Sequence, residues 1–154
     1  MPRPPLPPFT PATAIHKLRL AEDAWTSHDP TRVALARAPD SRWRNRSTLL
    51  QGRAGIESFL TPQWQRELDY RPTKEPWAFR EGRIAAHFDC EWHGADGQSL
   101  RSQGNKNRAF DGEGLMHTHI ASINDLPITE AERLHHWPAG RLPGDRAGLT
   151  GLGL

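Results

Sequence analysis

The sequence is short of cysteine and has no long apolar run. Cys90 is the only cysteine among 154 residues, so no disulfide can form within the chain, and a reducing compartment is favoured. No apolar run approaches the length of a membrane span, and the proline-rich residues 1–8 lack the apolar core of a secretory signal. These absences predict a soluble cytoplasmic protein with no membrane partner.

The sequence also lacks an excess of charge of one sign. Twenty Lys and Arg residues face eighteen Asp and Glu residues, which leaves a net charge of +2 and little long-range field. The densest basic stretch, residues 42–46, alternates on a predicted strand, so its arginines share a face that Trp43 does not. We therefore expect no nucleic-acid partner. The motifs of P-loops, dinucleotide sites, serine hydrolases and zinc proteases are missing too, and no cofactor is expected.

The N-terminal third is helical after a proline-rich arm. Residues 1–11 hold six of the fourteen prolines, which predicts an extended arm that lies on its own domain or on a partner subunit. Thr13 is a candidate N-cap for a first helix, and Asp29 followed by proline begins a second helix that ends near residue 37. Gly52 precedes a third helix, and Pro62 is expected to start a new turn.

Strands dominate the rest of the chain. A short strand is predicted at 41–46, and four longer ones at 67–79, 83–93, 98–110 and 115–125 are separated by hairpin-type turns. In the second long strand one face carries Ile84, Ala86, Phe88, Cys90 and Trp92, as in a half-buried antiparallel strand. Helices followed by such a sheet predict an α+β cone with an internal pocket. The expected organisation is an arm (1–11), one domain (12–128) and a Gly/Pro-rich tail (129–154).

Several stretches together resemble the DUF1348 family of the NTF2-like, or SnoaL-like, superfamily. They are residues 41–46 (SRWRNR), 67–71 (ELDYR), 77–79 (WAF), 91–93 (EWH), 121–128 (ASINDLPI), 137–141 (WPAGR) and 145–154. The resemblance implies an NTF2-like cone, commonly a homodimer that pairs through the sheet face, and no settled activity. It also leads us to expect an aromatic residue where Cys90 stands, and an acidic residue and then Trp where Lys106 and Arg108 stand. The pocket is then more cationic and larger than in relatives.

Strand parity predicts which side chains face the pocket. The first hairpin should place Glu75 and Trp77 on the face of Phe88, while Phe110 sets a parity that turns Lys106 and Arg108 inward. On the last strand we favour the set with Met116, Ile120 and Asn124 as inward over the set with His117 and His119. The residues expected to bind a ligand are Trp43, Asn45, Trp77, Phe88, Cys90, Trp92 and Asn124.

Lys106 is the sharpest candidate for chemistry. A desolvated amine loses proton affinity, so Lys106 could act as a base or a nucleophile near neutral pH. Glu75 could move the proton instead, and Arg108 or Asn45 would stabilise a developing oxyanion. The commoner role for such a lysine is structural, either in an ion pair with Glu75 or Glu91 or reaching out to solvent.

Three other groups have a structural and a chemical interpretation. Glu91 and His93 share a face with His87 and could form an acid–base pair, but that face should be the outer one, which favours a subunit interface. His117 and His119 could chelate a metal from one strand face, yet a third ligand is lacking, and we expect no metal. Cys90 is expected to be a small core residue rather than a nucleophile.

These observations favour a protein that binds a small organic molecule in the cone. It could be a cofactor-independent enzyme that catalyses proton transfer, hydration, elimination or isomerisation. The alternative is a non-catalytic ligand-binding or dimeric assembly module, which the arm and tail would suit. A pocket with convergent polar groups favours the enzyme, and a closed dry core favours the module.

Overall fold

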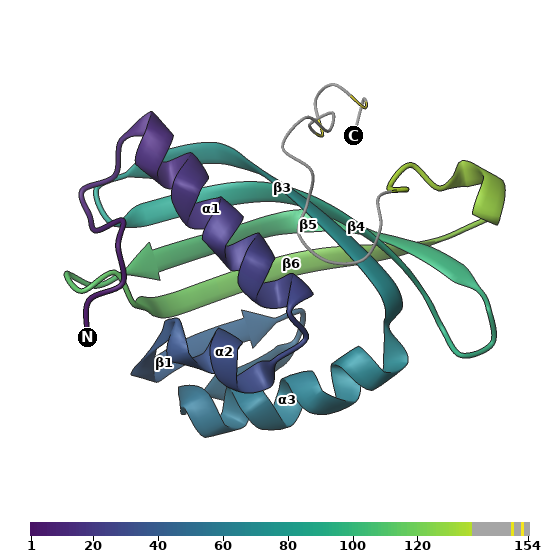
Figure 1. Ribbon diagram of the computed structural model, residues 1–154, viewed down its shortest axis with the longest axis horizontal. Helices are drawn as coiled ribbons and strands as arrows, with labels where there is room; N and C mark the ends of the chain where they lie inside the picture. Colours follow the sequence, from purple (N-terminus) through teal and green to yellow (C-terminus); the bar gives the residue numbers. More distant parts are fainter. Residues whose placement is uncertain (137–148, 150–151, 153–154) are drawn as a thin grey trace.

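The computed structural model describes residues 1–136, Leu149 and Leu152, and within them three helices cover one face of a six-stranded sheet (Figure 1). The helices are α1 (Pro11–Thr26), α2 (Pro30–Leu35) and α3 (Gly52–Arg66), with a 3₁₀ turn at Glu130–Glu132. The strands are β1 (Arg37–Asn45), β2 (Thr48–Gln51), β3 (Leu68–Arg80), β4 (Arg83–His93), β5 (Ser99–Phe110) and β6 (Met116–Ile128). Most of the predicted tail lies outside the described residues.

The sheet has the order β2-β1-β6-β5-β4-β3. All neighbours are antiparallel except β1 and β6, which run parallel. The α+β cone predicted from the sequence is confirmed. Within the described part of the chain, no helix is both long and apolar enough to cross a membrane.

The helix ends differ from the predicted ones by a few residues. Thr10, not Thr13, is the N-cap of α1: the Thr13 N–H donates to the Thr10 hydroxyl, and the Thr10 N–H donates to Thr13 Oγ1 at 2.7 Å. Asp29 caps α2 as predicted. However, α2 ends at Leu35 and β1 begins at Arg37, so the first strand starts earlier than expected.

Helix α3 runs through Pro62 without a break, although a new turn was predicted there. Leu60 and Trp64 are both buried on the side of α3 that faces the core, and the Trp64 ring lies 5.5 Å from that of Trp25. We attribute the continuity to this packing, which outweighs the hydrogen bond that proline cannot make. The short edge strand β2 was not predicted, because its mostly exposed residues carry no core pattern.

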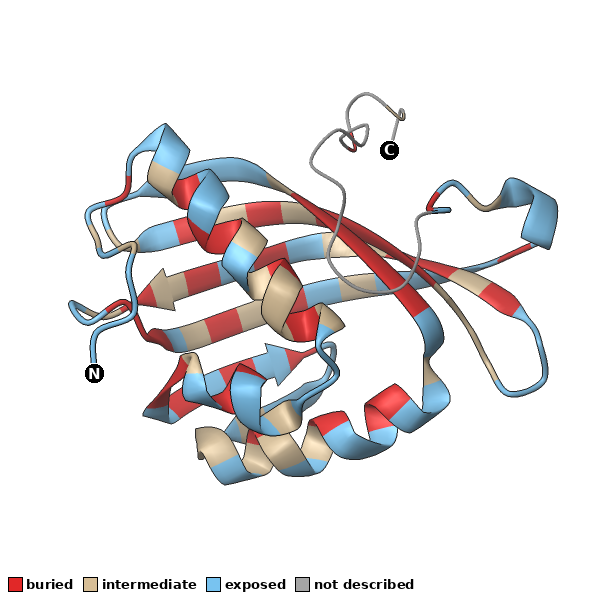
Figure 2. Ribbon diagram, viewed as in Figure 1, coloured by how far each residue is buried: buried red, intermediate tan, exposed pale blue. Residues whose placement is uncertain are grey.

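Strands β4 and β5 have the predicted parity (Figure 2). Ile84, Phe88 and Cys90 are at most 2% exposed. Lys106 pairs with Ala86 and Arg108 with Ile84, so both cationic side chains point inward with the apolar set. Gly104 occupies an inward position of β5, between Phe88 of β4 and Ile123 of β6. A Cβ at this position would collide with the carbonyl of Ser122.

Two irregularities invert the parity expected elsewhere. The register of β3 shifts between Pro76 and Ala78, so Lys74 faces Phe88 while Glu75 pairs with His87 on the outer side. The prediction that Glu75 faces the pocket is therefore wrong. Trp77, expected in the pocket wall, is 78% exposed for the same reason.

The second irregularity lies between Ala109 and Phe110, against the start of β6. Beyond it, His119 pairs with Arg108 and is buried, so it faces inward. Met116 is buried as expected, but the expectation that Ile120 and Asn124 face inward is wrong, because they pair with the outward Asn107 and Gln103. The inward set of β6 beyond the irregularity comprises His119, Ala121, Ile123 and Asp125.

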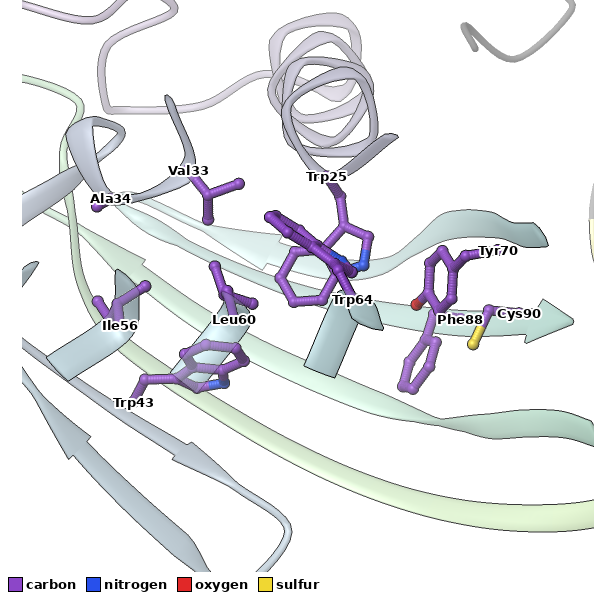
Figure 3. Packing of buried hydrophobic residues seen from close by; sticks show 10 residues of the cluster. All are labelled: Trp25, Val33, Ala34, Trp43, Ile56, Leu60, Trp64, Tyr70, Phe88 and Cys90. Carbon is purple, nitrogen blue, oxygen red and sulfur yellow. The ribbon is translucent and has the colours of Figure 1, made fainter. Parts of the chain in front are cut away.

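The core has two parts. The larger one lies between the helices and the sheet, with the ring of Trp25 projecting from α1 into its middle (Figure 3). The smaller one lies at the other end of α1, where Phe9 meets Phe110 edge to face at 5.4 Å. The N-terminal arm closes this end: the Phe9 N–H donates to Glu81 O, and Lys17 Nζ donates to Arg3 O at 2.7 Å.

The segment after β6 lies against the outer face of the sheet and is fastened there by Glu91. The Glu91 carboxylate accepts backbone N–H groups from Leu134 and His135 and a guanidinium bond of 2.7 Å from Arg101. His135 Nε2 lies 2.7 Å from Asp89 Oδ1. Burial tends to raise the pKa of Glu91, but these donors together lower it. Glu91 is thus a structural anchor. The acid–base pair with His93, the less favoured alternative, is not formed, since that ring contacts the Gly94 carbonyl.

Replacing this anchor should destabilise the protein markedly. We expect Glu91→Gln to lower the free energy of unfolding by about 3 kcal/mol, because the buried Arg101 loses its nearest carboxylate and keeps only Asp89 at 3.9 Å. The control is Glu130→Gln, whose carboxylate is 75% exposed and whose pair with Arg133 should contribute less than about 1 kcal/mol. Urea unfolding at pH 7 measures both, and equal losses would contradict the anchoring role.

Candidate functional site

A cavity of about 200 Å³ opens between α3 and the inward face of the sheet. We call it the outer cavity, although it lies on the inward face of the sheet. Its apolar wall is mostly aromatic and includes Trp25, Trp43, Phe59, Tyr70 and Phe88. The polar groups that line it include Asn45, Gln63, Glu67, Ser102 and Lys106. Apolar walls with a few convergent polar groups are typical of small-molecule sites.

The structure brings together five of the residues predicted for the site. Trp43, Asn45, Phe88, Cys90 and Lys106 all line the outer cavity. Their approach depends on the parallel pairing of β1 with β6, which carries the Trp43 side of β1 toward β4 and β5. Their roles in binding or catalysis stay predictions.

Other predicted residues lie elsewhere. Glu75, Trp77 and Asn124 are on the outer face or exposed, for the reasons given above. Trp92 does not line the cavity; its indole N–H donates to Ser102 Oγ at 3.0 Å, and Ser102 in turn donates to Asp125 Oδ1 at 2.6 Å. Trp92 therefore helps to orient a polar residue of the wall, and its contact with a ligand stays a prediction.

Lys106 is buried in the cavity wall against two aromatic rings. Its Nζ lies 4.3 Å from the centre of the Phe88 ring and 5.1 Å from that of Trp25. Among the described residues, no hydrogen bond or ion pair engages this amine, and Glu75 and Glu91 lie across the sheet from it. Burial, and then repulsion from Arg108, lower the pKa of Lys106 to about 7. Unlike an ordinary lysine, Lys106 therefore populates its neutral form near neutral pH.

Glu67 is a site residue that the sequence reasoning missed. It follows α3 directly, and its carboxylate accepts a bond of 3.2 Å from Gln63 Nε2. Burial raises the pKa of Glu67, against the lowering effect of the Gln63 amide. Residues 63 and 67 are four apart and so lie on one side of a helix. This spacing was the signal in the sequence that could have identified Glu67.

Cys90 and Tyr70 also border the outer cavity but are inert at neutral pH. Burial raises the pKa of the Cys90 thiol to about 12, so it stays protonated. Burial likewise raises the pKa of Tyr70 well above its ordinary value. Neither supplies a nucleophile or a ready acid.

A second, smaller cavity of about 40 Å³ lies deeper, and we call it the inner cavity. It shares Trp25 and Lys106 with the outer cavity. Its remaining polar lining is cationic or basic and consists of Arg37, Lys74, Arg108 and His119. All four are at most 7% exposed.

His119 is the centre of a stacked arrangement in the inner cavity. Its ring lies 5.2 Å from that of Trp43 at an angle of 3°, and the Arg37 guanidinium lies 4.6 Å from the Trp43 ring. Burial, and then the charge of Arg37, hold the pKa of His119 well below its usual range, so the imidazole is neutral. His119 was missed because the set of β6 that contains Met116, Ile120 and Asn124 was expected to face inward.

Two groups can be considered as metal ligands. His117 is exposed while His119 is buried, because the irregularity at the start of β6 separates their faces, and the shared face predicted for this pair is wrong. Asp89, Glu91 and His135 offer ligand atoms within 4.8 Å of one another. Arg101 already lies 2.7 Å from Glu91 and 3.9 Å from Asp89, so this cluster has its positive charge in place.

The chain is similar to one described family and to several solved structures. The family model described as "Protein of unknown function (DUF1348)" matches residues 7–136, and no curated protein matches. A Δ5-3-ketosteroid isomerase from Mycobacterium sp. has a similar fold, with a TM-score of 0.62, 15% identity and coverage of 73% of this chain and 98% of that one. A putative SnoaL-like polyketide cyclase from Shewanella putrefaciens gives a TM-score of 0.63 and 17% identity over 75% of this chain and 91% of that one.

An NTF2-like protein of unknown function from Exiguobacterium is similar as well. It has a TM-score of 0.60 and 11% identity, and the match covers 73% of this chain and 98% of that one. At such identities the likeness shows a shared NTF2-like fold alone.

The buried amine should make stability depend on pH in a defined direction. Lys106 releases its proton near pH 7 when folded and near 10.5 when unfolded, so between these values the unfolded state binds more protons and stability rises with pH. From pH 6 to pH 9 this contribution is about 2–3 kcal/mol. We expect Lys106→Met to lose that increase and to be more stable than the wild type at pH 6.

Urea unfolding at the two pH values measures the difference. Arg44→Met, which removes an exposed cation on β1, is the matched control and should keep the wild-type dependence. The same pH dependence in Lys106→Met and the wild type would contradict the assigned proton affinity.

Proposed function

Because this chain belongs to the DUF1348 family and has the NTF2-like fold, we propose that it binds a small organic molecule in the outer cavity, where Lys106 transfers a proton. The single observation that carries this proposal is the position of Lys106: an amine in an aromatic cavity wall, with no carboxylate bound to it among the described residues. A structural lysine is expected to have an ion partner or to donate to acceptors, as Lys17 donates to the Arg3 and Gly114 carbonyls.

The cavity supports binding of a small ligand. Its volume of about 200 Å³ is below the roughly 300–1,000 Å³ of sites for drug-sized molecules, which indicates a small metabolite. Trp43 and Phe88 offer flat apolar surfaces, and Asn45 adds an amide whose Oδ1 is buried with no hydrogen-bond partner among the described residues. These groups would orient the ligand against Lys106.

The arrangement supports a proton shift. The neutral Lys106 amine can take a proton from a carbon next to an electron-withdrawing group and become an ammonium. Glu67 in its protonated form, which burial favours, can deliver a proton to a second position of the same molecule. The Lys106 ammonium and the Glu67 carboxylate then regain their starting forms by proton exchange with solvent. The sum of the two steps is an isomerisation; if a leaving group departs instead, the reaction is an elimination.

The fold is compatible with such chemistry. The similar structures include an isomerase and a putative cyclase, which supports a reaction in this cavity without identifying it. The non-catalytic binding module is the second candidate, and the presence of a cavity with convergent polar groups favours the enzyme over it.

The homodimer through the sheet face stays a prediction, as does the cytoplasmic location. Residues 129–135 occupy part of the outer face, around Asp89 and Glu91. A partner subunit would therefore use the other end of that face, near His87 and Asn105, whose side chains are half-buried and exposed.

Hydrogen–deuterium exchange tests the proposed proton transfer. We expect the wild type to accelerate exchange at the carbons next to the carbonyl of cyclohexanone or phenylpyruvate in D₂O, followed by NMR. Lys106→Met should reduce the acceleration by about 100-fold or more, the usual contribution of a general base. The wild-type rate should rise through pH 7 as the Lys106 amine loses its proton.

Glu67→Gln should slow the exchange less, because it removes the second proton donor and leaves the base. Arg44→Met serves as the control with the wild-type rate. Equal rates for Lys106→Met and the wild type would refute the role of the amine, and ligand binding without exchange would favour the non-catalytic module.

A further inference from the structure

The inner cavity contains hydrogen-bond donors that have no acceptor. Arg37 Nη1, Arg108 Nε and Arg108 Nη1 are buried without a hydrogen-bond partner among the described residues, and so is His119 Nε2. Buried polar groups in native structures nearly always have partners, so four unmatched atoms on three neighbouring side chains require an explanation.

All four atoms are donors. Arginine has no acceptor, so Arg37 Nη2 donates the bond of 3.0 Å to His119 Nδ1. The imidazole is neutral, and its one proton is therefore on Nε2, the atom without a partner. Three side chains that line the inner cavity thus carry N–H groups for which no described residue supplies an acceptor.

The same residues carry more positive charge than the one nearby carboxylate balances. Arg37 and Arg108 have pKa values of about 9 and about 10, lowered by burial, so both remain charged at neutral pH. Among the described residues that line the inner cavity, none is acidic. Glu22 is the nearby carboxylate that attracts Arg108 and Lys74, but it already accepts the Lys74 N–H at 2.8 Å and lies 3.4 Å from Arg19. A buried guanidinium without a counter-charge is costly, and an anion would offset that cost.

Building on the proposed function, we propose that the ligand is an organic acid and that the inner cavity binds its carboxylate between Arg37, Arg108 and His119. A volume of about 40 Å³ exceeds the roughly 10–15 Å³ that a cavity needs to hold one water, which leaves room for a carboxylate head group. The planar guanidinium matches the two oxygens of a carboxylate.

The position of the inner cavity defines how such a ligand lies. Trp25 and Lys106 line both cavities. In the proposed pose the carboxylate occupies the inner cavity and the rest of the molecule extends past the Lys106 amine into the outer one. The carbons next to the carboxylate are then the ones that the amine can reach. The relative position of the two cavities would therefore determine both the preference for organic acids and the carbon that loses a proton.

Thermal unfolding with acetate tests the inner cavity by itself. In a low-chloride buffer, sodium acetate should raise the Tm of the wild type by about 3–6 °C at roughly ten times its dissociation constant. Acetamide, the uncharged isostere, should have no effect. Arg108→Met should not respond to acetate, while the control Arg44→Met should respond as the wild type does.

The melting temperatures of the ligand-free proteins distinguish a structural role of Arg108 from a role in binding the anion. Arg108→Met removes an uncompensated buried charge and should melt at a higher temperature than the wild type without acetate. If this variant does not fold, Arg37→Gln and Arg108→Gln provide the same comparison. Equal responses of wild type and variant to acetate, a response to acetamide of the same size, or no response of the wild type would each overturn the carboxylate site.

The outcome is separate from that of the proposed function. Acetate reports on the inner cavity, whereas exchange of cyclohexanone, which has no carboxylate, reports on Lys106 in the outer one. A failed acetate response with preserved cyclohexanone exchange would refute the carboxylate site alone.

Discussion

The interior of this cone is constrained by buried positive charge. Arg37, Lys74, Lys106 and Arg108 are each at most 7% exposed, and their inward positions follow from the strands that carry them. Cations so close together lower one another's pKa, in addition to the effect of burial. The neutral amine, the charged guanidinium groups and the unmatched donors are therefore consequences of one packing arrangement.

Aromatic rings partly offset the cost of burying these cations, but they do not neutralise the positive charge. Lys74 and Lys106 lie 5.8 and 5.1 Å from the Trp25 ring, and the Trp43 ring contacts both the Arg37 guanidinium and the His119 imidazole. A desolvated cation–π contact contributes about 2 kcal/mol, less than the several kcal/mol that desolvation of an ion costs. The rings thus hold the cations in place and leave their attraction for an anion unsatisfied. This balance implies that the ligand-free protein is less stable than variants in which a buried cation is replaced by an apolar residue. It also implies that the protein gains stability when it binds an anion.

The sequence predicts the fold and half of the site for identifiable reasons. Alternation along β4 and β5 is regular, so the inward placement of Phe88, Cys90 and Lys106 could be derived by counting. The irregularities near Pro76 and Ala109 insert single residues that alternation does not reveal, and each reversed a face. This is why Glu75 and Asn124 were expected inside and His119 was not. The partnership of Arg37 with His119 spans 82 positions and depends on the parallel pairing of β1 with β6, for which the sequence holds no local signal.

The most direct measurement of the central claim is anomalous diffraction from a crystal grown or soaked in bromide. The account predicts a bromide ion in the inner cavity, within hydrogen-bonding distance of Arg37, Arg108 and His119 Nε2. Bromide peaks confined to surface arginines, with the inner cavity free of bromide, would contradict the claim that this interior is built to hold an anion.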